Sequence, residues 1–199
     1  QDSNNPSAEF GRSAFDVRHR FTMSFSYDLP FGSSRSSATR GWAAALFGDW
    51  QANGIITVQS GSPFTVSLLS ELDNSNTGRA ALGFGFNDRP NLIADPNIQN
   101  PSANGWFNTK AFELSPYGTF GNAGRNILEG PGFANINLAL VKHANISAGG
   151  RLQFRVEAFN LLNRVNLGLP NAFLGSPRFA QIGSAGSARR MQIGIRLLF

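Results

Sequence analysis

The sequence predicts an all-β fold, an antiparallel sheet of about five or six long strands. In five segments, apolar and polar side chains alternate with a period of two, as they do along an extended strand. Several of these segments approach the ~9–11 residues of a tilted membrane-crossing strand, and the connections between them are very unequal in length. We therefore expect an antiparallel transmembrane β-barrel, of which this chain is an open arc with long extracellular loops.

The first two segments, 17–29 and 50–58, each have one apolar and one polar side. In the first, the odd positions are mostly apolar and the even positions are polar. In the second, Ile55 is the exception on an otherwise polar side. The apolar positions are Val17, Phe21, Met23, Phe25, Tyr27 and Leu29, then Trp50, Ala52, Gly54, Ile56 and Val58.

The other three segments, 134–140, 151–158 and 189–199, repeat the pattern. Their apolar positions are Ala134, Ile136, Leu138 and Leu140, then Leu152, Phe154, Val156 and Ala158, then Met191, Ile193, Ile195, Leu197 and Phe199. The last segment ends on Phe199, whereas the tail of a soluble domain usually frays. An aromatic residue at the end of a terminal strand is typical of bacterial outer-membrane proteins.

Counting strands back from the end predicts the topology. With the C-terminus in the periplasm, loops at about 62–131 and 164–188 are extracellular, and a short periplasmic turn lies near 143–150. A second periplasmic connection spans about 30–45, and Phe64-Thr65-Val66 extends a hairpin beyond the membrane. Tyr27, Trp50 and Phe199 then lie at the periplasmic ends of their strands, where barrels carry aromatic girdles.

Composition excludes several other classes of protein. The chain has no cysteine, and we expect no metal site, cofactor or catalytic site. The net charge of +5 comes from dispersed arginines, with only Lys110 and Lys142 as lysines, so we expect no nucleic-acid binding. A soluble sugar-binding β-sandwich is the alternative that alternation alone leaves open.

Several blocks together resemble the TonB-dependent outer-membrane receptors, in the branch with a carboxypeptidase-regulatory-like N-terminal domain. The blocks follow one another in order along nearly the whole chain. They are 15–21, 54–64, 88–92, 106–108, 118–126, 130–132, 154–164 and the terminal strand.

The resemblance implies a barrel of about 22 strands closed by a plug domain. Residues 1–199 would be its C-terminal fragment, with the plug and the TonB-contacting region upstream. It implies an active transporter of a siderophore, vitamin, oligosaccharide or peptide in the bacterial outer membrane. Its partners would be lipid, the plug, the TonB complex and, through the C-terminal strand, the barrel-assembly machinery. A passive porin or an adhesin-like barrel is the first alternative.

Candidate site residues belong to two groups. Arginines on the predicted lumen face would contact an anionic or polyhydroxylated substrate or acidic side chains of the plug. Alternatively, they would pair with lumen carboxylates such as Glu157 and Asp28, or would be hydrated. These are Arg18, Arg20, Arg151, Arg155 and Arg196. Aromatic residues of the long loop would stack on a ligand or fold the loop upon itself. These are Phe84, Phe86, Trp106, Phe107 and Tyr117. Phe199 is the expected membrane-insertion signal.

Overall fold

The structure is a computed structural model that describes residues 1–30, 48–72, 74–77, 88–146 and 150–199. The chain divides into two compact units. The sheet unit contains Arg20–Gln59, Phe133–Val165 and Ser187–Phe199, and the loop unit contains Gln1–His19, Ser60–Gly132 and Asn166–Gly186. Phe84, Phe86 and most of the expected connection 30–45 lie outside the described residues.

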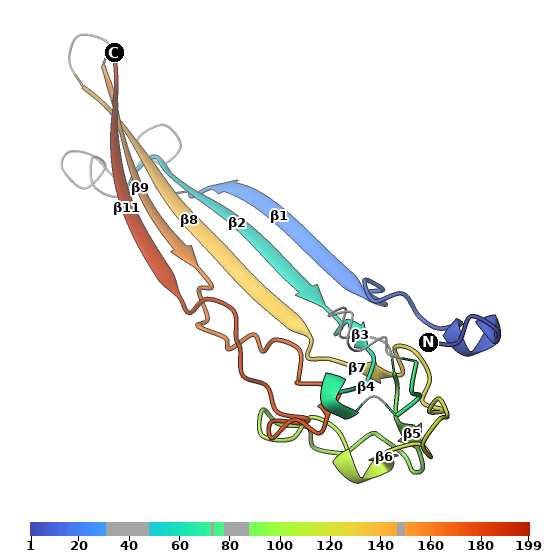
Figure 1. Cartoon of the computed structure of the whole chain (residues 1–199). Coiled ribbons are helices and arrows are strands. Elements are labelled where there is room, and N and C mark those ends of the chain that lie inside the picture. The colour runs from blue at the N-terminus through green and yellow to red at the C-terminus, as the bar shows by residue number, and fades with distance from the viewer. Residues whose placement is uncertain (31–47, 73, 78–87, 147–149) are drawn as a thin grey trace. The chain divides into compact units, whose positions relative to one another are not determined.

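The sheet unit is a single antiparallel sheet of five long strands (Figure 1). The strands are β1 (Arg20–Asp28), β2 (Trp50–Gln59), β8 (Phe133–Asn145), β9 (Arg151–Phe159) and β11 (Arg190–Leu198). They lie in the order β1-β2-β8-β9-β11, so each long strand pairs with the next long strand of the chain. This order confirms the predicted meander and its open edges. No helix among the described residues is long and apolar enough to cross a membrane.

The strand register gathers the apolar side chains on one face, which we call the apolar face. Ile56 lies opposite Met23 on one side and Ile136 on the other. Val156 lies between Leu140 and Ile193 in the same way. Phe21, Ile136, Phe154 and Ile195 therefore share a face instead of meeting across two layers. For the described residues the β-sandwich alternative is wrong.

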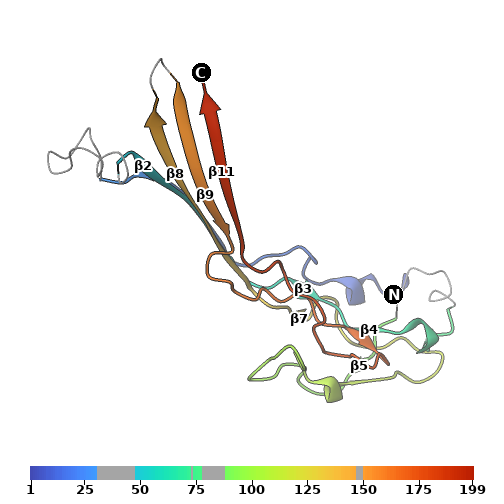
Figure 2. The ribbon, with the colours of Figure 1, turned by 90° about the vertical axis from the view of Figure 1, so that its left-hand side faces the viewer.

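The apolar face is exposed to an extent that water would penalise. Met191 and Ile193 are each 69% exposed and Ile195 is 70% exposed. A contiguous apolar surface of this kind marks contact with another apolar medium. In Figure 2, β2, β8, β9 and β11 run side by side along this sheet.

Two strand boundaries differ from the prediction. β1 begins at Arg20 instead of near residue 17, because its partner β2 ends at Gln59, before the Ser60-Gly61-Ser62-Pro63 break. β8 continues to Asn145, beyond the predicted end. The connection to β9 is closed by Ile146, whose amide donates to the Gly150 carbonyl at 2.8 Å.

Lys142 interrupts the apolar alternation of β8, and its surroundings explain how the strand tolerates it. It lies opposite Trp50 in the register, with Nζ 5.6 Å from the Trp50 ring centroid. The ammonium also donates to the Gly48 carbonyl at 2.6 Å. Phe154 meets Trp50 edge to face, with ring centroids 6.3 Å apart. A lysine beside aromatic rings is typical of a membrane–water interface.

The loop unit consists of short elements. Among its described residues, two-residue strands pair as β3 (Pro63–Phe64) with β7 (Leu128–Glu129), β4 (Ser67–Leu68) with β10 (Phe173–Leu174), and β5 (Asn91–Leu92) with β6 (Phe112–Glu113). The same residues include the 3-10 turns η1 (Pro6–Glu9), η2 (Ser70–Leu72) and η4 (Thr109–Ala111). Phe64 pairs with Leu128, and Gln59 pairs with Phe133. The step of five residues forward from Gln59 is matched by five residues backward from Phe133, as expected for an extended hairpin.

The core of the loop unit is built around Phe107, which is 3% exposed. Its ring centroid lies 5.8 Å from those of Phe64 and Phe112 and 5.1 Å from that of Phe179. Such edge-to-face and tilted contacts add about 0.5–1.5 kcal/mol per pair beyond area burial. Gly61 lies against the backbone of Gly130, where a Cβ would overlap the carbonyl. The loop unit is therefore a packed body with a core of its own.

The exposed apolar face yields a stability prediction. Ile193→Arg in the complete barrel should destabilise the folded state in a bilayer by about 2–4 kcal/mol, the cost of an arginine facing lipid near the midplane. Gln192→Arg, one residue away on the opposite face, is the matched control and should change stability little. Urea titrations of folding in phospholipid vesicles measure both. Equal costs for the two variants would contradict lipid contact by this face.

Candidate functional site

The sheet's second face, which we call the polar face, carries four of the five predicted arginines. Arg20 lies opposite Gln59, and Arg151 lies between Asn145 and Leu198. Arg155 and Arg196 also lie at positions whose side chains point to this face. Arg18 precedes β1 and belongs to the loop unit, so its predicted place on the strand is wrong.

Three of these arginines form a group on β9 and β11. Arg196 lies directly opposite Gln153, so Arg151 and Arg155 are its two diagonal neighbours. Diagonal neighbours in a sheet are about 7–8 Å apart, within reach of long side chains. Arg155 Nη2 donates to Glu157 Oε1 at 2.7 Å. Within the described ranges, Arg151 and Arg196 make no ion pair, and this part of the polar face is net positive.

A hollow of about 350 Å³ lies along the same sheet. Its lining includes the polar-face side chains of Ser24, Asn53, Asn137, Arg155 and Glu157. Apolar residues, among them Phe25, Ile55 and Leu138, make up the rest of the lining, so polar groups and carbon surface share this hollow. The alternation predicted Asn53 and Asn137 on the polar sides of their strands, but only Arg155 of this lining was predicted as a substrate-binding residue.

The predicted loop aromatics separate into different roles. Trp106 Nε1 donates to the Glu129 carbonyl at 2.8 Å, and its ring packs against the loop core. Phe107 is the centre of that core. Both contacts fit the alternative that these rings fold the loop upon itself. Tyr117 remains 74% exposed, beside the turn at Gly118.

Asn160 closes the end of β9. It is 6% exposed and has φ of +52°, a left-handed conformation that asparagine tolerates better than most residues. Its Nδ2 donates to the carbonyls of Arg164 and Ser187, each at 3.0 Å. Its Oδ1 accepts from the Arg164 amide at 3.0 Å. The neighbouring Asn163 has φ of +51° and accepts from the Arg189 amide at 2.9 Å. The 154–164 block thus fixes the exit of one strand and the entry of the next.

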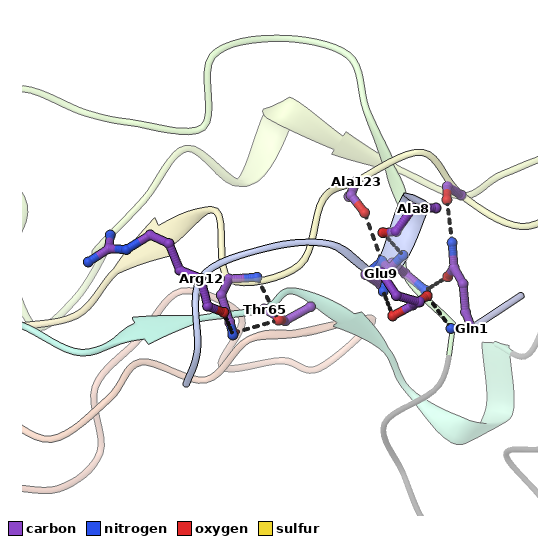
Figure 3. A network of polar contacts seen from close by, with 9 residues as sticks. Gln1, Ala8, Glu9, Arg12, Thr65 and Ala123 are labelled. Atoms are coloured by element: carbon purple, nitrogen blue, oxygen red, sulfur yellow. Dashed lines mark hydrogen bonds and ion pairs between the residues drawn. The ribbon is translucent and has the colours of Figure 1, made fainter. Parts of the chain in front are cut away.

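Arg89 is a buried charge of the loop unit, at 4% exposed. Figure 3 shows the network that contains its partners Ala8, Glu9 and Ala123. Its Nη1 donates to Glu9 Oε2 at 2.9 Å and its Nη2 to the Ala8 carbonyl at 3.0 Å. Nε donates to the Ala123 carbonyl at 2.8 Å. Every guanidinium nitrogen therefore has a partner, which a buried cation requires.

This network joins three segments far apart in sequence. Two further hydrogen bonds reinforce it. The side-chain oxygen of Asn122 accepts from the Leu92 amide at 2.7 Å, and the side-chain oxygen of Asn91 accepts from the Asn122 amide at 3.0 Å. The blocks 88–92 and 118–126 are thus docked on one another. The Arg89 guanidinium lowers the pKa of Glu9 to about 2 by donating to the charged carboxylate.

No cluster of three or more metal-binding side chains occurs among the described residues. Phe199 follows β11 with its side chain fully exposed.

The chain is similar to a known protein family. A family described as an outer membrane beta barrel domain matches residues 1–192. No curated protein and no solved structure matches the chain.

The Asn160 contacts predict a measurable loss of stability. Asn160→Ala removes three side-chain hydrogen bonds at a buried site, and Asn163→Ala removes one while altering the same backbone conformation. At about 0.5–1.5 kcal/mol per bond, Asn160→Ala should cost about 1–3 kcal/mol more than Asn163→Ala. Urea unfolding of the complete barrel measures the difference. Equal costs would mean that Asn160 acts through its backbone alone.

The Glu9–Arg89 pair predicts an acid-dependent loss of stability in the loop unit. Because the pKa of Glu9 falls from 4.5 to about 2 on folding, the pair stabilises the fold above pH 4.5. That contribution disappears as pH falls from 4.5 through 2. Pepsin should cleave the loop unit slowly at pH 4 and faster at pH 2, relative to an unstructured peptide in the same tube. Glu9→Gln should lose this difference; a retained pH response would assign it to other carboxyls.

Proposed function

Because the chain belongs to the outer membrane β-barrel domain family, we propose that it is barrel wall and loop surface of a TonB-dependent active transporter. The solute would be a scarce nutrient: a siderophore, vitamin, oligosaccharide or peptide. The observation that carries the proposal is the loop unit, a packed body with its own core and a partly buried ion pair. A passive pore needs no such body, whereas a receptor that selects a dilute solute does.

The receptor-like sequence blocks support this proposal through what they contact. Block 88–92 supplies Arg89, block 118–126 supplies its Ala123 partner, and block 106–108 supplies Phe107 at the loop core. Block 154–164 contains Asn160. Each block therefore carries an interaction that shapes the loops or their junction with a strand.

The two faces of the sheet support a barrel with a polar interior. The apolar face would contact acyl chains, and the polar face with Arg151, Arg155 and Arg196 would line the lumen. An open sheet edge is not tolerated in hydrocarbon, so further strands would pair with β1 and β11. A plug domain would fill the lumen, and TonB would supply the work for release.

The aromatic side chains support a periplasmic C-terminus. Trp50 and its neighbours Phe154 and Lys142 lie toward the end of the sheet that carries the β8–β9 connection, as does Phe199. An amphipathic ring beside a lysine suits the headgroup level of the membrane. The long loops would then face outward, where a solute is first met.

Two measurements on the full-length protein separate this proposal from a passive porin or adhesin-like barrel. A plugged receptor should bind the purified C-terminal domain of TonB and should show no steady conductance in planar bilayers. A porin should show steady conductance without binding TonB. An adhesin-like barrel should show neither, and either of these outcomes would overturn the proposal.

Phe199 gives a prediction about assembly. Deleting Phe199 should impair insertion into the outer membrane, because the assembly machinery would read the aromatic end of the last strand. Phe199→Tyr keeps an aromatic terminus and is the matched control, expected to assemble normally. Surface labelling of intact cells measures both variants. Normal surface levels after the deletion would count against this role.

A further inference from the structure

The loop unit contains a hollow of about 500 Å³ that the proposed function does not use. It lies among the segment before β1, the stretch around β3 and β4, residues 125–126 and residues 169–173. Ligand pockets in proteins span about 300–1,000 Å³, so the hollow has room for a molecule of the size of one or two sugar rings.

The lining of this hollow carries two arginines, Arg89 and Arg125, and only Arg89 is paired within the described residues. Arg89 lines it but is neutralised by Glu9 at 2.9 Å. Arg125 also lines it, is exposed, and makes no ion pair within the described residues. An unpaired arginine in the lining of a pocket suits a carboxylate, which it can bind through two parallel hydrogen bonds.

The backbone that carries Arg125 is held in place. The adjacent Asn126 has φ of +54° and is buried. Its Oδ1 accepts from Thr65 Oγ1 at 2.8 Å, and its backbone amide donates to that threonine oxygen at 2.9 Å. Its Nδ2 donates to the Arg12 carbonyl at 2.6 Å (Figure 3). A binding group on a fixed backbone loses less entropy on binding.

The remaining lining combines hydroxyls with carbon surface. Ser67 is buried, and its hydroxyl makes no hydrogen bond within the described part of the chain. Thr65 also lines the hollow. Phe64, Phe173 and Leu169 supply apolar surface. Hydroxyls beside aromatic faces fit a body that is itself hydroxylated and ring-shaped.

We propose that this hollow binds an acidic sugar, with the ligand carboxylate on Arg125, a ligand hydroxyl on Ser67 and a sugar ring against the apolar wall. The inference deepens the proposed function, because it selects a uronate-bearing oligosaccharide among the possible solutes. Equilibrium binding needs neither TonB nor a proton gradient. The site can therefore succeed or fail independently of the transport mechanism.

The experiment measures binding of digalacturonate and of its methyl ester to the full-length protein in detergent, by isothermal titration calorimetry. The acid should bind at least tenfold more tightly than the ester. Added salt should reduce the ratio of the two dissociation constants, because it screens the charge on the carboxylate. Arg125→Gln should weaken binding of the acid at least tenfold and leave the ester unchanged. Arg178→Gln removes an exposed charge outside the hollow and should change neither affinity.

Three results would overturn the inference. Equal affinities for the acid and the ester would remove the role of the carboxylate. An unchanged acid affinity in Arg125→Gln would place the site elsewhere. Binding of benzoate as tight as that of digalacturonate would show that the ligand body is not a sugar. If digalacturonate binds as expected and TonB does not bind, the site stands and the transport proposal fails.

Discussion

Backbone pairing in an antiparallel sheet determines which residues share a face, and the rest of this structure depends on that constraint. Opposite residues in paired strands point to the same side, so a shift by one residue would move a whole strand's apolar set to the other face. Here every neighbouring pair of long strands keeps the apolar positions together, as Ile56 with Ile136 and Phe154 with Ile195 illustrate. The exposed apolar face and the arginine-bearing polar face both follow from this register.

The same residue type has two separate uses in this chain. Arg89 is buried, and its guanidinium nitrogens are all satisfied by Glu9 and two carbonyls, so it holds loops together. Arg151 and Arg196 lie on an open face without ion pairs in the described residues, so their charge is available to a solute. Burial and partners distinguish the two uses, and neither can be read from the residue type.

Local patterns predicted the sheet well because strand periodicity is written in consecutive residues. The five long strands and their order follow from alternation, and errors arose only where a partner ended or an exception intervened. β1 starts at Arg20 because β2 stops, and β8 passes through Lys142 because Trp50 and a carbonyl accommodate its ammonium. The loop unit was beyond such reasoning. Glu9 and Arg89 meet across 80 residues of sequence, and no periodicity indicates that contact. The hollow beside Arg125 depends on the same long-range docking.

The position of Lys142 has a consequence for the bilayer that this protein fits. Lys142 lies opposite Trp50, the first apolar position of β2. From Trp50 to Val58 the apolar positions of β2 extend about 27 Å along the strand, at about 3.4 Å per residue. With a strand tilt of about 40°, this corresponds to about 20 Å of hydrophobic thickness. The bacterial outer membrane is thinner than average, so such a short span matches it. A bilayer of lipids with long acyl chains would have to become thinner around this sheet. A bilayer of short-chain lipids would match the sheet without a change in thickness.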